Sequence, residues 1–407
     1  MKSQISLLLL ILVVGGKFGK LVTMVVNERL MKRRIFADLY DFHTFPTTTT
    51  TNTEDEQSFR VKMSAFLEKH AHLMHSHSAT MLPAFLDPVV GASSLGDGKS
   101  KAVLGFDFSA TDLISLPATS TSVITKDVTL NPNHNTWFRI FLARQALDNT
   151  STNNSVGKTK LPLIVYYHGG GFILLSADST MNHDFCFNMA LQLSAEVVSV
   201  EYRLAPEHRL PAAYDDAVEA LHWIKCTQEK LLRDFADYSK CFLMGTSAGG
   251  NIAYHVGLRA STAVCDFEPL KIKGLILHHP FFGGSKRTES KLRLLNTPVL
   301  PLCSTDLMWK LALPIGVDRD HGYCNPTVGD GFEQFDQIRE LGWWVVVTGC
   351  DGDPLVDRQM ELVEMLKKKG VKVEAQFNEG DYHGVELMDV TKANALFVFL
   401  MYFLEKC

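Results

Sequence analysis

The sequence predicts an α/β protein with a mostly parallel sheet flanked by helices on both faces. Apolar, strand-like runs and helix-like segments alternate from about residue 160 to the carboxyl end. This alternation is typical of parallel sheets, because each crossover between parallel strands needs a connecting helix. The strand-like runs are apolar throughout, as expected for strands that are buried on both faces.

The chain changes in composition near residue 120. We expect residues 1–120 to form an N-terminal extension, partly flexible, that could serve as a signal or cap-forming segment, and residues 121–407 to form the α/β domain. Residues 46–57 are polar and Thr-rich, which is typical of a flexible linker. Residues 59–72 have the spacing of an amphipathic helix.

The amino-terminal residues carry an ambiguous targeting pattern. Residues 5–14 form an apolar run that has the length of a signal-peptide core and is too short to span a membrane. A cleavage region is poorly matched, because Lys17 and a second apolar stretch at residues 21–26 follow. The N-x-S sequons at Asn149 and Asn153 would fit a secreted protein. We expect no stable membrane span.

Charge and cysteine content exclude several classes of protein. The formal net charge of −5 gives no reason to expect nucleic acid or an anionic membrane as a partner. The eight cysteines form no C-x-x-C pair and no Cys/His cluster with zinc-like spacing. Buried, reduced thiols are the simpler interpretation. We therefore expect neither a metal nor a cofactor, and the oligomeric state is left open.

The α/β domain is predicted to begin with two antiparallel strands, at residues 122–130 and 136–142, joined by an Asn-Pro-Asn turn. Buried strands follow at residues 163–167, 196–202, 241–244, 274–278 and 343–348, with a shorter one at 371–377. Helices are predicted at residues 183–193, 213–226, 251–260, 360–369 and 392–405.

Residues 281–330 interrupt the alternation with Gly, Pro and scattered aromatic residues. We interpret this segment as a cap inserted over the carboxyl ends of the strands. Its apolar side chains would either line a ligand pocket or form the cap's own core. The candidates are Phe281, Phe282, Leu302, Met308 and Trp309.

A nucleophile motif lies between a predicted strand and a predicted helix. Residues 245–249 read G-T-S-A-G, which has the form G-x-S-x-G. In this motif the serine occupies a sharp strand-to-helix turn, and the flanking glycines let neighbouring chain pass closely. The amino terminus of the following helix favours developing negative charge. Ser247 is the predicted nucleophile.

A glycine-rich loop follows the predicted strand at residues 163–167. His168 begins the sequence H-G-G-G-F. An oxyanion needs several backbone N–H donors aimed at one point, and glycine allows the main chain to come that close. We expect Gly169, Gly170 and Gly171 to form this oxyanion hole, with the N–H of Ala248 as a further donor.

In proteins with this motif, an acid and then a histidine follow the nucleophile along the chain. Asp353 follows the strand at residues 343–348, and His383 lies in a glycine-flanked loop before the last helix. Asp351 and Asp357 are competitors for the acid. Asp353 is favoured over both, because Pro354 fixes a tight loop directly after it and the helix begins beyond.

Other polar residues receive structural interpretations. His278 and His279 end a core strand and are expected to pack or hydrogen-bond locally. His168 is expected to tie the glycine loop to neighbouring backbone. The segment 201–208 contains no obvious nucleophile, and we interpret it as a loop fixed by salt bridges.

These motifs together resemble the hormone-sensitive-lipase-like branch of the α/β-hydrolases and, more closely, the plant carboxylesterase family. The resemblance covers about residues 120–407. It rests on the segments KDVTLNPNHNTWFRIFLAR (126–144), HGGGF (168–172), EYRLAPEHRLPAAYDDA (201–217), GTSAGGN (245–251), GCDGDPLVDRQ (349–359) and the YHG around His383. The first hundred or so residues match the family's usual start poorly.

The resemblance implies a serine carboxylesterase that hydrolyses small carboxylic esters, with a triad of Ser247, Asp353 and His383. Two alternatives come from the same family: a dehydratase- or cyclase-type lyase of plant specialised metabolism, and a hormone receptor. Gibberellin receptors in the family lack the catalytic histidine, which this sequence keeps. The resemblance favours a cytoplasmic enzyme, with secretion as the alternative.

Overall fold

The computed structural model describes residues 122–148, 160–328 and 331–407. These ranges belong to the predicted α/β domain. The signal, linker and helix predicted within residues 1–120 lie outside the described residues, and so do the sequon residues Asn149 and Asn153.

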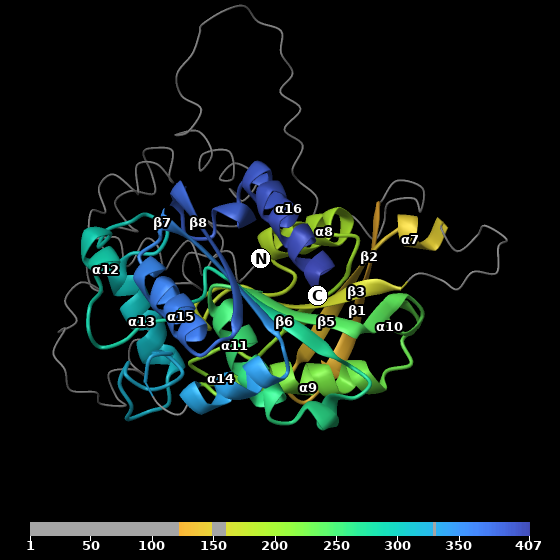
Figure 1. The fold of residues 1–407 in the computed structure, drawn as a ribbon, viewed down its shortest axis with the longest axis horizontal. Helices are drawn as coiled ribbons and strands as arrows, with labels where there is room; N and C mark the ends of the chain where they lie inside the picture. Colours follow the sequence, from red (N-terminus) through yellow and green to blue (C-terminus); the bar gives the residue numbers. More distant parts are fainter. Residues whose placement is uncertain (1–121, 149–159, 329–330) are drawn as a thin grey trace, which may run out of the picture. The chain divides into compact units, whose positions relative to one another are not determined.

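The described residues form one eight-stranded sheet in the order β1-β2-β4-β3-β5-β6-β7-β8 (Figure 1). Strand β2 runs antiparallel to β1 and to β4, and all other pairs are parallel. The predicted α/β-hydrolase fold, with a mostly parallel sheet, is confirmed. The strands are β1 (Val123–Asn131), β2 (Thr136–Ala143), β3 (Leu161–Tyr167), β4 (Glu196–Glu201), β5 (Ala236–Thr246), β6 (Ile272–His278), β7 (Trp344–Gly352) and β8 (Lys372–Tyr382).

Helices cover both faces of the sheet. On one face α8 and α16 pack against each other, and on the other α11 packs against both α9 and α14 (Figure 1). Helix α15 packs against β7 and β8. The bounds are α7 (Gln145–Asp148), α8 (Thr180–Gln192), α9 (Ala212–Cys226), α10 (Lys230–Phe235), α11 (Ala248–Ser261), α12 (Glu289–Arg293), α13 (Leu302–Ala312), α14 (Gly331–Glu340), α15 (Val356–Lys368) and α16 (Val390–Lys406), with short 3₁₀ turns η1 (Val264–Phe267) and η2 (Val385–Leu387).

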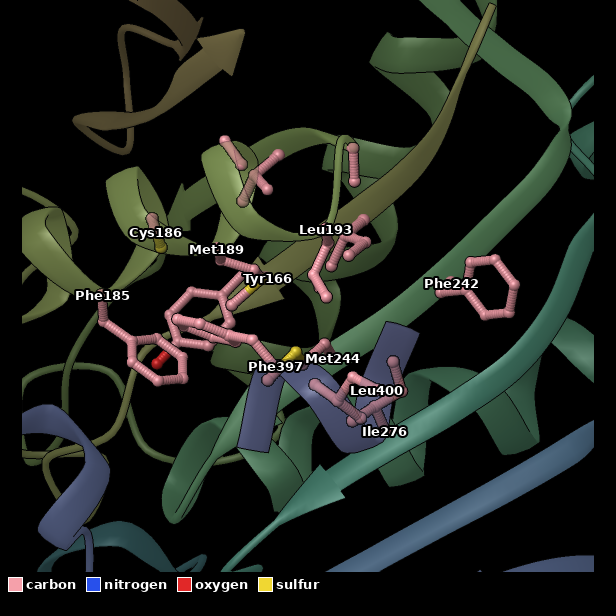
Figure 2. Close-up of a cluster of buried hydrophobic side chains, with 14 of the residues drawn as sticks. Tyr166, Phe185, Cys186, Met189, Leu193, Phe242, Met244, Ile276, Phe397 and Leu400 are labelled. Atoms are coloured by element: carbon pink, nitrogen blue, oxygen red, sulfur yellow. The ribbon is translucent and has the colours of Figure 1, made fainter. Parts of the chain in front are cut away.

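A hydrophobic cluster joins α8 and α16 to the sheet (Figure 2). Phe185 of α8 lies against Phe397 of α16, with 5.2 Å between the ring centroids. Both contact a sheet face that includes Tyr166 and Met244, which are fully buried. Burial of each such side chain contributes on the order of 2 kcal/mol. This packing holds β3 and β5 rigidly, and both candidate site loops follow directly from those two strands.

The observed elements differ from the predicted ones chiefly at their ends. Strand β7 continues to Gly352 and β8 to Tyr382, because the two strands stay paired through Gly352 and Tyr382. That pairing is a tertiary effect, invisible in a local apolar pattern. Helices α7, α10, α12, α13 and α14 were not predicted from the sequence. The first three have six residues or fewer, α13 lies in the segment interpreted as a cap, and α14 is largely polar in composition.

The segment between β6 and α14, which the sequence predicts to be a cap, contacts α11 and the loop after β3. Asn251 in α11 donates from Nδ2 to the carbonyls of Phe281 (3.1 Å) and Tyr323 (2.8 Å). Trp309 of α13 packs on Phe172, in the loop after β3. The segment is therefore anchored around the loop of the predicted nucleophile, and a role in covering bound ligand remains a prediction.

All eight cysteines lie in described residues and are free thiols. Four are buried, but the prediction of burial is wrong for Cys226, Cys265 and Cys303, which are exposed. As for membranes, none of the helices in the described ranges has both the length and the apolar character needed to cross one.

Candidate active site

Ser247 occupies the turn between β5 and α11, in a backbone conformation that few residues adopt. Its φ is 57° and its ψ is −116°. The conformation is held by backbone hydrogen bonds from Ser247 N to the carbonyl of His278 and from Phe281 N to the carbonyl of Ser247, each 2.9 Å. Such strain persists only where surrounding structure fixes it. The surroundings also explain why the motif ends in glycine, because a Cβ on Gly249 would lie 1.8 Å from the carbonyl oxygen of Tyr167.

The structure brings the three predicted triad residues together. His383, directly after β8, lies with Nε2 2.9 Å from Ser247 Oγ. Its Nδ1 lies 2.8 Å from Oδ2 of Asp353, in the loop between β7 and α15. A neutral imidazole that donates from Nδ1 to the carboxylate can accept the serine proton at Nε2. The geometry is that of a nucleophile, a base and a group that orients the base.

The two competing aspartates have other contacts. Asp351 accepts a hydrogen bond from Gly380 N (2.9 Å) at an exposed position between β7 and β8. Asp357 accepts from Ser290 N (2.7 Å) and so ties α12 to α15. Of these three acids, Asp353 is the one that meets His383.

Asp353 is fully buried and accepts four hydrogen bonds. They come from Leu355 N (2.9 Å), Gln359 Nε2 (3.0 Å), His279 Nδ1 (2.9 Å) and His383 Nδ1 (2.8 Å). Burial opposes ionisation of the carboxyl, but the two histidines outweigh it and hold the pKa of Asp353 well below its usual value. The group is a fixed carboxylate.

The interpretation of His279 as a locally packed residue is incomplete. Its Nδ1 contacts Asp353 Oδ2, and its Nε2 lies 3.4 Å from Oε2 of Glu386 in η2. His278 approaches the same oxygen with Nε2 at 3.3 Å. Sequence reasoning did not find Glu386 at all. The available signal was the position of His279 at the end of the strand beside β5, which places it next to the nucleophile.

The glycine loop lies beside Ser247, as the oxyanion prediction requires. A Cβ on Gly169 would contact the Cβ of Ser247 at 3.4 Å. Among the described residues, no group accepts a hydrogen bond from the backbone amides of Gly169, Gly170 or Gly171. Ala248 is the first residue of α11, so its amide has no intrahelical partner. These N–H groups can stabilise an oxyanion at the serine, and that role stays a prediction.

Side chains from the segment after β4 hold this loop. The Tyr202 hydroxyl donates to the carbonyl of His168 (2.8 Å), and the two rings stack with centroids 4.2 Å apart. His168 Nδ1 lies 2.8 Å from the carbonyl of Gly169. Glu201 accepts from Ser176 Oγ (2.8 Å) and Ala177 N (2.7 Å) further along the loop. His168 and the segment at 201 have the structural tasks predicted for them.

The cap side chains divide between core and site. Phe281, Phe282 and Trp309 are fully buried, and the rings of Phe281 and Trp309 stack 4.7 Å apart, so these three form core. Met308 differs, because it packs directly over Gly171: a Cβ there would lie 2.3 Å from the sulfur. Met308 therefore contacts this loop at Gly171, whereas Trp309 contacts it at Phe172.

Two clusters near Ser247 have donor atoms close enough together to hold a metal ion: His278 with His279 and Glu386, and His279 with Asp353 and His383. In the second cluster the ring nitrogens already hydrogen-bond the carboxylate. A proton between each nitrogen and its oxygen accounts for these distances.

The fold and the site together define a hydrolase with a serine at a strand-to-helix turn. A family model described as alpha/beta hydrolase fold matches residues 164–387. The chain belongs to this family.

Similar proteins sharpen that assignment. The chain is 50% identical over 301 residues to carboxylesterase 20 of Arabidopsis thaliana, which covers 72% of this chain and 91% of that protein. It is 52% identical over 283 residues to 3-O-acetylpapaveroxine carboxylesterase CXE1 of Papaver somniferum, 67% and 86% of the two chains. A gibberellin receptor of Oryza sativa subsp. japonica is more distant, at 39% identity over 216 residues, 51% of this chain and 56% of the receptor.

A solved esterase of Pyrobaculum calidifontis has a TM-score of 0.57 at 26% identity, with 70% of this chain and 85% of that chain covered. Carboxyl esterase 2 of Tuber melanosporum shares the fold, with a TM-score of 0.58 at 20% identity and coverage of 72% and 88%. The two plant carboxylesterases and the Pyrobaculum calidifontis esterase indicate a carboxylic ester hydrolase and do not favour a receptor.

Proposed function

We propose that this chain is a serine carboxylesterase that hydrolyses small carboxylic esters through an acyl-enzyme on Ser247. The observation that carries the proposal is the continuous contact from Ser247 Oγ through His383 to Asp353, at 2.9 and 2.8 Å. A serine without a base at this distance is a weak nucleophile at neutral pH.

In the first half of the reaction, Ser247 Oγ attacks the ester carbonyl while His383 Nε2 takes its proton. The resulting oxyanion accepts hydrogen bonds from the amides of the glycine loop and Ala248. His383 then gives its proton to the leaving alcohol, and the carbon–oxygen bond of the ester breaks. Asp353 stabilises the imidazolium that exists between these two steps.

In the second half, water replaces the alcohol. His383 accepts a proton from the water as its oxygen attacks the acyl carbon, and a second oxyanion forms in the same place. Collapse of that intermediate releases the carboxylic acid and returns the proton to Ser247 Oγ. These two steps need only the three side chains and the backbone amides.

The surroundings of the loop favour a short acyl group. Met308 packs on Gly171 beside the candidate oxyanion donors and restricts the space there. The relative from Papaver somniferum is named for an acetyl ester, which fits this choice.

The direct test is hydrolysis of p-nitrophenyl acetate by the full chain. We expect turnover by the wild type and a loss of about 10⁴-fold or more in kcat for Ser247→Ala. Ser261→Ala is the matched control, because Ser261 lies at the other end of α11 and its hydroxyl donates to the carbonyl of Leu258 within the same helix. Its activity should equal that of the wild type.

Product analysis separates the alternatives. Absence of hydrolysis by the wild type, with several short acyl esters, contradicts the esterase proposal. A lyase would convert a substrate without releasing both acid and alcohol. A receptor would bind its ligand equally well after Ser247→Ala, since binding needs no nucleophile.

A further inference from the structure

Two histidines contact the same carboxylate oxygen of Asp353. His383 and His279 approach Oδ2 at 2.8 and 2.9 Å, and their rings meet edge to face with centroids 5.4 Å apart. The ester-hydrolysis mechanism uses only His383. His279 is fully buried and lies too deep to meet substrate.

The contacts of the two rings set their proton content. In the proposed mechanism His383 Nε2 accepts the proton of the Ser247 hydroxyl, which requires the ring to carry its own proton on Nδ1, toward Asp353. His279 has a carboxylate oxygen at both nitrogens: Asp353 Oδ2 at 2.9 Å and Glu386 Oε2 at 3.4 Å. A neutral tautomer would aim a lone pair at one of these carboxylates. The arrangement therefore suits an imidazolium at His279.

The other titratable groups packed around His279 carry no compensating positive charge. His278, its neighbour in β6, is buried, and burial lowers the pKa of that ring, which keeps it neutral. Its Nδ1 lies 2.6 Å from Thr348 Oγ1. Burial raises the pKa of the Cys350 thiol in β7, with Asp353 and Glu386 acting in the same direction. The charged groups facing His279 are thus two carboxylates.

We propose that His279 is a positioning residue for this active site: a buried imidazolium, clamped between Asp353 and Glu386, that fixes the Asp353 carboxylate and sets the lower pH limit at which His383 works as a base. This inference rests on the proposed esterase function, in which His383 must be neutral to accept the serine proton. It assigns a function to His279 and Glu386, which the triad leaves without one.

Burial opposes a charge on His279, but the hydrogen bond with Asp353 and the nearby Glu386 carboxylate, 3.4 Å from Nε2, outweigh it and raise the pKa of His279 to about 9. The positive charge is consequently present throughout the neutral range. Without it, the buried cluster that contains His383 would hold the carboxylates of Asp353 and Glu386 with no cation between them. Protonation of His383 would then become easier, and activity would be lost at a higher pH.

The test is the pH profile of kcat/KM for His279→Asn. Asparagine tolerates the φ of 45° at this position and can donate from Nδ2 to Asp353, but carries no charge. We expect the acid limb to move upward by about one to two pH units, from the interaction of unit charges at this separation. KM should change little, because His279 does not touch substrate.

His278→Gln is the matched control. Glutamine keeps a neutral donor toward Glu386 in the same buried cluster, so the acid limb should stay where it is in the wild type. An unmoved acid limb in His279→Asn, or an equal shift in His278→Gln, overturns the proposal. Either result would show that the cluster acts only through packing.

A second measurement does not depend on variants that fold or on any substrate. In the wild-type protein labelled with ¹⁵N-histidine, both ring nitrogens of His279 should be protonated at pH 7. A neutral His279 ring overturns the inference even if ester hydrolysis is confirmed. Absence of ester hydrolysis in the wild type would instead contradict the proposed function.

Discussion

On one side of Ser247, His383 and Asp353 are backed by further titratable side chains, His279 and Glu386. On the other side, the loop from His168 to Phe172 offers uncharged backbone amides. The side that contains Asp353, called the acid side below, is held in place by interactions among buried charged groups. The path of the loop is determined by its backbone conformation, with a φ of 109° at Gly170 and 61° at Gly171.

The difference has a physical consequence. A buried charge cluster depends on protonation, and removing one charge alters every other group in it. A set of backbone amides has no proton to lose in this range, but it fails if the main chain cannot take the required path. Substitutions on the acid side should therefore change pH profiles, whereas substitutions at the loop should change kcat at every pH.

Asp353→Asn should have the largest effect on the acid side. The variant keeps the shape but presents an amide to groups that all donate, which include both histidines and Gln359. We expect kcat to fall by about 10⁴-fold, because His383 loses the partner that fixes its tautomer. Stability should fall by about 3 kcal/mol or more, since the positive charge on His279 loses its carboxylate. Steady-state kinetics and thermal unfolding measure the two losses.

The matched control for this variant is Asp357→Asn. Asp357 is four residues along the chain and bonds only Ser290 N among the described residues. Its kcat should stay within a few-fold of the wild type, as is usual for a surface hydrogen bond. A comparable loss in both variants would show that the loop between β7 and α15 matters only as a whole, and the assignment of Asp353 would be wrong.

The triad shows how far sequence reasoning reaches. Ser247 and His383 could be predicted because short motifs mark them and because chain order restricts the base. Asp353 had neighbours of the same type at 351 and 357. In the structure Asp351 lies in β7 and Asp357 in α15, and of the three acids Asp353, in the loop between them, is the one that hydrogen-bonds His383. His279 and Glu386 meet across 107 residues of sequence, and neither has a motif, so only the fold brings them together.

The fold itself was predictable where strands are buried on both faces. Strands β3, β4 and β6 have nearly continuous buried runs, and their bounds were close to those predicted. Strand β8 is largely half-exposed, and its second half lacks an apolar pattern, so its length depends on pairing with β7. Helix α14 is polar in composition, but its apolar residues Phe335 and Ile338 have helical spacing, so the signal was present in the sequence and was missed.

Gly170→Ala should have the next largest effect and acts on the loop. A Cβ at this position would lie 2.0 Å from the carbonyl oxygen of Leu174, and its φ of 109° is unfavourable for alanine. The loop must therefore shift and withdraw its amides from the serine. We expect kcat to fall by about 10²- to 10³-fold, as for loss of one oxyanion donor. The fall should be equal at all pH values from the neutral to the alkaline range.

Gly171→Ala offers a comparison within the same loop. There the new Cβ would meet Met308 Sδ at 2.3 Å, which is a flexible side chain rather than backbone. Adding Met308→Ala should restore part of the activity lost by Gly171→Ala, because the clash is relieved while the φ of 61° still strains an alanine, whereas Met308→Ala should not rescue Gly170→Ala. Rescue of both variants, or of neither, would contradict the view that backbone contact at Gly170 determines the loop's path.

Tyr202→Phe should have the smallest effect and gives the sharpest separation of the two sides. The substitution removes the hydroxyl that donates to the His168 carbonyl (2.8 Å) but keeps the ring that stacks on His168. Loss of one buried hydrogen bond costs about 1 kcal/mol of stability, and a similar loosening of the loop would lower kcat about two- to fivefold.

Tyr238→Phe is the control, because Tyr238 donates in the same way to the carbonyl of Ile224 (3.0 Å), far along the chain from the loop. It should lose similar stability and keep full kcat. The acid limb of kcat/KM should not move in either tyrosine variant, since neither hydroxyl adds charge near His383. A shifted acid limb in Tyr202→Phe would mean that the conformation of the glycine loop affects the protonation of the charge cluster. The two sides of Ser247 would then not act independently.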